Sequence, residues 1–160
     1  MMAEHEVKII NDLIREYKPE ICLEWGSGNS TSYFPKEHEC IKQWVSVEHD
    51  GHYSEYLARR VDLDKVIHIW VPDNAWYVDC VKHQGRRYDF VLIDGLMRDE
   101  CLRTAHQITR EGGIILLHDA GREEYYKFIR RYGNRTVLCK GEQPNEKGGY
   151  DHRGLVLFRV

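Results

Sequence analysis

The chain alternates short apolar runs with amphipathic segments, which predicts strands and helices in turn. Apolar residues recur at helical spacing between Val7 and Tyr17, and Pro19 ends that first helix. Short apolar runs then predict seven strands, over residues 21–25, 44–48, 66–71, 88–93, 114–117, 136–140 and 155–160.

Helical patterns occupy the intervals between the first five strands. Ser30 or Thr31 can cap a brief helix that must end at Pro35 or soon after, and Asp50 can cap a helix over residues 53–60. Further helices are predicted over residues 75–83, 101–108 and 125–132.

This order of elements predicts an α/β fold. Strands that are apolar at successive positions are covered on both faces, which is typical of a parallel sheet between two layers of helices. The last two strands have only the polar, Gly-rich stretch 141–153 between them, so they should pair as an antiparallel hairpin. We therefore expect a Rossmann-like, doubly wound sheet of five parallel strands plus a C-terminal antiparallel hairpin, seven strands in all.

Composition limits the alternatives. A chain of 160 residues suits one domain (residues 1–160), with an N-terminal helix over 1–18 and a core over 19–160. Apolar residues make up 42%, which excludes a disordered chain, and the net charge of −3 argues against nucleic acid as a partner. With no membrane span, no signal segment and no Cys-x-x-Cys pair among its five cysteines, the protein is expected in the cytoplasm.

Candidate chemistry gathers where the strands end, because ligands bind beyond the carboxyl ends of the strands in open parallel sheets. The first strand leads into Gly26 and Gly28, which allow a sharp turn and a close approach to a ligand, and then into a helix N-terminus that can hold an anion. The second strand ends in Glu48, 22 residues after Gly26, where an acid can bind ribose hydroxyls. A dinucleotide fingerprint would need glycine where Thr31 stands.

Four segments together resemble the class I S-adenosylmethionine-dependent methyltransferases, in particular small O-methyltransferases associated with sugars and polysaccharides. They are residues 23–28 (LEWGSG), 45–49 (VSVEH), 88–95 (YDFVLIDG) and 112–119 (GGIILLHD). The resemblance extends over about residues 19–160 and implies S-adenosylmethionine as the cofactor.

The resemblance also implies roles for individual residues. The glycine loop would pass beneath the methionine part of the cofactor, and Glu24 would fix its ammonium through bound groups or water. Glu48 would hold the ribose, His49 would lie beside the adenine, and Asp94 would lie near the sulfonium and the substrate. The implied cofactor-binding residues are Glu24, Trp25, Gly26, Ser27, Gly28, Ser30, Glu48, His49 and Asp94.

Asp94 and Asp119 end neighbouring strands, which lie about 4.8 Å apart in a sheet. Two carboxylates at such a short distance favour a divalent cation, and some O-methyltransferases of this class hold Mg²⁺ with acids at these positions. We therefore expect Mg²⁺ or another divalent cation on Asp94 and Asp119, although Ala120 stands where those enzymes have a third oxygen ligand. The alternative is that Asp119 caps the next helix without a metal.

Two further residues are candidates for catalysis. His118 is the expected general base, because a neutral imidazole accepts a proton near pH 7; the alternative is a strand histidine that points away from the cleft. His118 and Asp119 can share a site only if the strand has ended before Asp119. Arg98 cannot act as a base but can hold an oxyanion or a phosphate; the alternative is a solvated arginine at a helix start.

The expected activity is methyl transfer to a sugar hydroxyl on a glycan or a nucleotide-sugar. About 20 residues precede the first strand, so little chain is left to enclose the acceptor. An open site suits a large acceptor, or a site completed by a second copy in a homodimer. The alternatives are a methyltransferase for a small phenol or amine, a non-catalytic cofactor-binding subunit, and a dinucleotide-dependent oxidoreductase.

Overall fold

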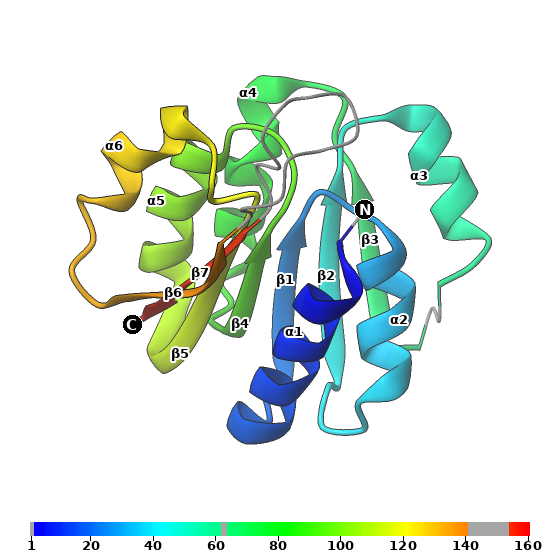
Figure 1. The fold of residues 1–160 in the computed structure, drawn as a ribbon. Helices are drawn as coiled ribbons and strands as arrows, with labels where there is room; N and C mark the ends of the chain where they lie inside the picture. The colour runs from blue at the N-terminus through cyan, green and yellow to red at the C-terminus, as the bar shows by residue number, and fades with distance from the viewer. Residues whose placement is uncertain (1, 62–63, 141–153) are drawn as a thin grey trace, which may run out of the picture.

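The computed structural model describes residues 2–61, 64–140 and 154–160, and a seven-stranded sheet forms its centre (Figure 1). The strand order is β3-β2-β1-β4-β5-β7-β6. The strands are β1 (Ile21–Trp25), β2 (Gln43–Glu48), β3 (Val66–Trp70), β4 (Tyr88–Ile93), β5 (Thr109–His118), β6 (Arg135–Lys140) and β7 (Gly154–Arg159).

The pairing pattern confirms the predicted fold class. Strands β1 to β5 pair in parallel, whereas β7 pairs antiparallel with both β5 and β6. The predicted connection of the hairpin, residues 141–153, lies outside the described residues. Because the order changes direction between β1 and β4, the loops after these two strands diverge, and a ligand site is expected in the crevice that opens there.

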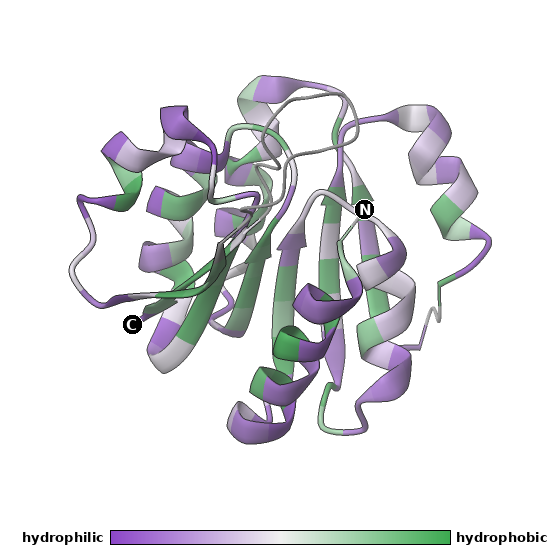
Figure 2. Ribbon diagram, in the orientation of Figure 1, coloured by the Kyte–Doolittle hydropathy of each residue, from purple (hydrophilic) through white to green (hydrophobic). Residues whose placement is uncertain are grey.

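Helices cover both faces of the sheet. They are α1 (Glu4–Tyr17), α2 (Asn29–Glu37), α3 (Gly51–Ala58), α4 (Asn74–Tyr77), α5 (Arg98–Ile108) and α6 (Tyr126–Ile129), with 3-10 turns η1 (Asp79–Gln84) and η2 (Glu123–Tyr125). Apolar side chains of α1 and α2 pack in one core, and those of α4, α5 and α6 pack in another across the sheet. Figure 2 shows the apolar residues concentrated along the strands and the polar residues on the outer sides of the helices. No helix in the described ranges is long and apolar enough to cross a bilayer.

Two predicted helices are shorter than expected. The segment 75–83 divides into α4 and η1, and near the junction the Tyr77 carbonyl accepts the Trp25 Nε1–H at 3.1 Å. The segment 125–132 contains only the end of η2 and the short helix α6. After α6 the backbone N–H groups bond to carbonyls three residues back, as the N–H of Tyr132 does to the Ile129 carbonyl. The predicted N-cap Asp50 is confirmed, since its side chain accepts the N–H of Tyr53 at 2.9 Å.

Candidate functional site

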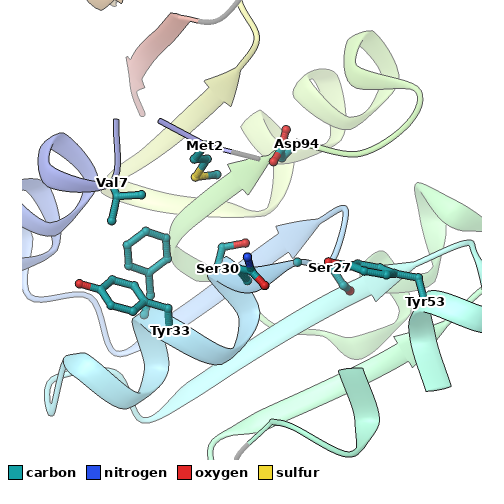
Figure 3. A pocket seen from close by; sticks show the side chains of 10 residues that line it. Met2, Val7, Ser27, Ser30, Tyr33, Tyr53 and Asp94 are labelled. Carbon is teal, nitrogen blue, oxygen red and sulfur yellow. The ribbon is translucent and has the colours of Figure 1, made fainter. Parts of the chain in front are cut away.

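Two adjoining cavities lie at the carboxyl ends of the parallel strands, and three residues line both: Ser27, Tyr53 and Asp94. The first cavity, of about 570 Å³, lies between the ends of β2 and β4; among its lining residues are Gly26, Glu48, His49, Arg98, Arg122 and Tyr125. The second, of about 450 Å³, is bordered by the N-terminal segment and α2; Figure 3 shows Met2, Val7, Ser30 and Tyr33 around it. Both volumes are in the range of about 300–1,000 Å³ that is usual for small-molecule sites.

The first turn after β1 brings two backbone segments into direct contact. Gly26 has φ +92°, and a Cβ there would lie 2.4 Å from the Gly95 nitrogen. Any side chain at this position would therefore push the exit of β1 away from the exit of β4. The need for glycine comes from this packing of loop on loop, which also opens the first cavity beside it.

Glu24 supports this turn from inside the protein. Its side chain is fully buried and accepts hydrogen bonds from Ser30 Oγ and from three more donors: Thr31 Oγ1 at 2.6 Å, Trp44 Nε1 at 3.0 Å and Ser46 Oγ at 3.0 Å. Burial raises the pKa of this carboxyl to about 6, although the four hydrogen bonds act to lower it. Glu24 thus anchors the first turn of α2 to β2, and it lines neither cavity.

Glu48 is held at the end of β2 by its own loop. Its Oε1 accepts the backbone N–H groups of His49 and Asp50, both at 2.8 Å, and the residue is only 4% exposed. These bonds fix the carboxylate at the wall of the first cavity. A fixed carboxylate at this position is suited to accept hydrogen bonds from a pair of ribose hydroxyls.

Asp94, at the end of β4, is connected to a buried chain of ionisable groups. Its Oδ1 lies 2.6 Å from His118 Nδ1, and His118 Nε2 lies 3.1 Å from Oε2 of Glu6. Glu6 belongs to α1 and is fully buried. The imidazole therefore donates at both nitrogens, one to each carboxylate.

This arrangement bears on the predicted role of His118 as general base. Burial lowers the pKa of the imidazole, but the hydrogen bonds to Asp94 and Glu6 outweigh burial and raise that pKa to about 9. The raised pKa favours the protonated imidazole at neutral pH, which argues against proton removal by His118. The general-base role of His118 stays a prediction.

The two acids at the strand ends are neutralised by side chains. Arg98 is 7% exposed, and its Nη2 lies 3.2 Å from Asp94 Oδ1 and 3.4 Å from Asp119 Oδ2. Arg122 Nη2 adds a second contact to Asp119 Oδ2 at 2.8 Å. The strand ends at His118, and Asp119 takes a left-handed backbone conformation with φ +54°, which turns its carboxylate back toward Arg98.

The guanidinium groups of Arg98 and Arg122 already neutralise these acids, which gives them an alternative to a divalent cation. The possible ligand atoms of Asp94, His118 and Asp119 lie within 4.8 Å of one another, so the metal site on Asp94 and Asp119 stays a prediction. Two close carboxylates do require positive charge, as the sequence predicts, but Arg98 supplies that charge. Arg98 is therefore part of the site and not a solvated arginine at a helix start.

Most of the predicted cofactor-binding residues line the cavities: Gly26, Ser27, Gly28, Ser30, Glu48, His49 and Asp94. Trp25 does not, because its side chain is fully buried in the core beneath Tyr77. Trp25 therefore supports the loop from the core. Glu24 lines neither cavity but binds Ser30, which does, so the indirect hold on the cofactor's ammonium stays a prediction. His118 contacts Asp94 and Asp119 contacts Arg98, but neither His118 nor Asp119 lines either of the two cavities.

Sequence reasoning missed several residues of the site, among them Arg122 and Tyr125 of the first cavity. Tyr53 lines both cavities from the first turn of α3, and Glu6 binds His118 from α1. A signal for Glu6 was present, since it lies four residues before Ile10 and so on the apolar face of the helix. An acid on such a face needs a buried partner.

The two cavities fit S-adenosylmethionine. Glu48 offers a carboxylate for ribose, and the glycine turn leaves backbone accessible beside it. Ser27, Ser30 and Asp94 offer polar groups for the amino-acid part and the sulfonium.

Comparison with known proteins agrees with this fit. A family model described as "Methyltransferase domain" matches residues 23–120, more than half of the chain. No curated protein matches the sequence.

Solved structures share the fold at low sequence identity. An O-methyltransferase from Bacillus cereus in complex with S-adenosylhomocysteine has a TM-score of 0.72 at 18% identity, over 98% of this chain and 81% of that one. The O-methyltransferase TomG from Streptomyces achromogenes, in complex with S-adenosylmethionine, gives 0.68 at 16%, over 98% and 80%. The N-methyltransferase NodS from Bradyrhizobium japonicum gives 0.64 at 13%, over 98% and 85%. These matches establish the class I methyltransferase fold and leave the acceptor atom open.

Proposed function

The chain belongs to the methyltransferase domain family, and we propose that it is an S-adenosylmethionine-dependent O-methyltransferase that acts on a hydroxyl of a sugar, on a glycan or a nucleotide-sugar. The observation that carries this proposal is the position of Asp94. Asp94 borders both cavities, so it can contact the sulfonium end of the cofactor together with an acceptor beside it.

Asp94 is suited to receive the proton of an acceptor hydroxyl. Within residues 2–61, 64–140 and 154–160, every hydrogen bond to this carboxylate falls on Oδ1, from His118 and Arg98. Oδ2 is the oxygen left for the acceptor. S-adenosylmethionine, when bound, supplies a methyl group on a positively charged sulfur, and the acceptor oxygen must lose its proton as the new bond forms.

Residues of the first cavity that the cofactor roles leave over support a polyhydroxylated acceptor. Arg98 and Arg122 provide donors, Asp94 provides an acceptor, and the Tyr125 ring provides an apolar surface. Sugars present both polar and apolar surfaces, whereas a simple phenol has few groups to match the polar ones. The preference for sugar also rests on the sequence resemblance described above.

A methyl-transfer assay tests the proposal. Labelled S-adenosylmethionine is offered with panels of glycans, nucleotide-sugars, phenols and amines, and product is detected by mass spectrometry. The matched control is Asp94→Asn, which keeps the shape of the side chain and removes its basicity. Product only with phenols or amines would overturn the sugar assignment, and cofactor binding without any product would favour a non-catalytic subunit.

A further inference from the structure

Glu6 is a buried acid that the cofactor site does not explain. It is fully buried on α1, and its Oε2 accepts the backbone N–H of Ala3 at 2.8 Å as well as facing His118 Nε2 at 3.1 Å. Burial raises the pKa of the Glu6 carboxyl, but the hydrogen bonds from His118 and Ala3 outweigh it, and the pKa ends below its ordinary value. The acid is therefore ionised at neutral pH and pairs with the imidazolium.

The pair joins parts of the chain that are far apart in sequence. Glu6 precedes His118 by 112 residues, and the contact ties the first turn of α1 to the end of β5. A buried, ionised carboxylate is costly unless it is paired, so a contact of this kind needs a compensating gain. His118 carries the effect onward, because its other nitrogen holds Asp94 Oδ1 at 2.6 Å.

We propose that Glu6 is a positioning residue of the methyl-transfer site, which holds the His118 imidazole in place at Nε2 and through it fixes Asp94 for removal of the acceptor proton. The inference rests on the proposed role of Asp94. In the reaction the acceptor oxygen bonds to the methyl carbon, the carbon–sulfur bond breaks with its electrons going to sulfur, and the acceptor proton moves to Asp94 Oδ2.

Several other polar and charged groups lie close to Glu6 and His118. Asp119 Oδ1 lies 3.5 Å from His118 Nδ1, and Arg98 donates to the His118 carbonyl. On the other side of Glu6, the side chains of His5 from α1 and Cys139 from β6 come within 4.8 Å of its carboxylate. The other oxygen of this carboxylate, Glu6 Oε1, is buried and has no hydrogen-bond partner among the described residues.

The test compares Glu6→Gln with Glu4→Gln, a matched change at an exposed position of the same helix. Glutamine preserves the shape and one acceptor oxygen but removes the charge that holds the imidazolium. We expect Glu6→Gln to lower kcat by at least about tenfold, which is about 1.4 kcal/mol in the barrier, with the KM for cofactor and the affinity for S-adenosylhomocysteine within about twofold of wild type. Glu4→Gln should match wild type in all three.

A second readout separates this inference from the proposed function. The His118 imidazole is titrated by NMR in wild type and in Glu6→Gln, with its signal assigned by its loss in His118→Asn. We expect a clearly lower His118 pKa in Glu6→Gln, whether or not an acceptor has been found. An unchanged His118 pKa would overturn the pairing itself. A lowered pKa with kcat within about twofold of wild type would overturn the positioning role while leaving the methyltransferase assignment intact.

Discussion

Replacing His118 by asparagine is predicted to remove a pH-dependent part of the stability of the fold. In the folded protein the pKa of the imidazole is lowered by burial but raised, by the hydrogen bonds to Asp94 and Glu6, from 6.5 to about 9. The folded state therefore binds this proton more tightly than the unfolded state does. The resulting stabilisation is complete below pH 6.5 and is lost as the pH rises through about 9. Since one pKa unit corresponds to about 1.4 kcal/mol, the full contribution is about 3 kcal/mol.

Urea denaturation of wild type and His118→Asn measures this contribution. Between about pH 6 and about pH 9.5, the difference in unfolding free energy between the two proteins should shrink by about 2–3 kcal/mol. Taking the difference matters because burial also raises the pKa values of thiols such as Cys22 and Cys101, which change stability at alkaline pH in both proteins. Two curves that stay parallel over this range would refute the imidazolium and the ion pairs that define it.

Three further outcomes follow from the site. Glu48→Ala should weaken binding of S-adenosylhomocysteine by about 1–3 kcal/mol in calorimetry, the scale of hydrogen bonds to a charged group; an unchanged affinity would mean that the ribose is held elsewhere. EDTA should leave methyl transfer unchanged, because Arg98 neutralises the acids at the strand ends; a loss of activity restored by Mg²⁺ would contradict this. Glu24→Ala should lower the free energy of unfolding by about 1–3 kcal/mol for each buried donor left without an acceptor. In urea denaturation, a loss no larger than that caused by Glu4→Ala, at an exposed position, would count against the anchoring role.

The strands were predictable because their signal is local. A run of apolar residues between turn residues is visible in any window of the chain, and the predicted bounds 21–25 and 88–93 coincide with β1 and β4. The short helices were less predictable because contacts with distant parts of the chain lie at their ends. Near the end of α4 the Tyr77 carbonyl accepts the indole N–H of Trp25, and nothing in the local sequence around Tyr77 indicates this contact.

For the site, topology was predictable and side-chain orientation was not. The rule for strand ends brings Glu48, Asp94 and Asp119 to one edge of the sheet, as the structure has them. The rule does not say that Glu24 faces inward to four donors, or that the Arg98 side chain folds back between two aspartates. These orientations depend on tertiary contacts, which a local pattern in the sequence does not record.

The most direct measurement is calorimetry of the wild-type protein with S-adenosylhomocysteine and NAD in parallel titrations. The account rests on an adenosyl-binding crevice between the ends of β2 and β4, with Glu48 on its wall. We expect saturable heat with S-adenosylhomocysteine at one site per chain, and none with NAD. Heat with NAD alone, or none with either ligand, would contradict it.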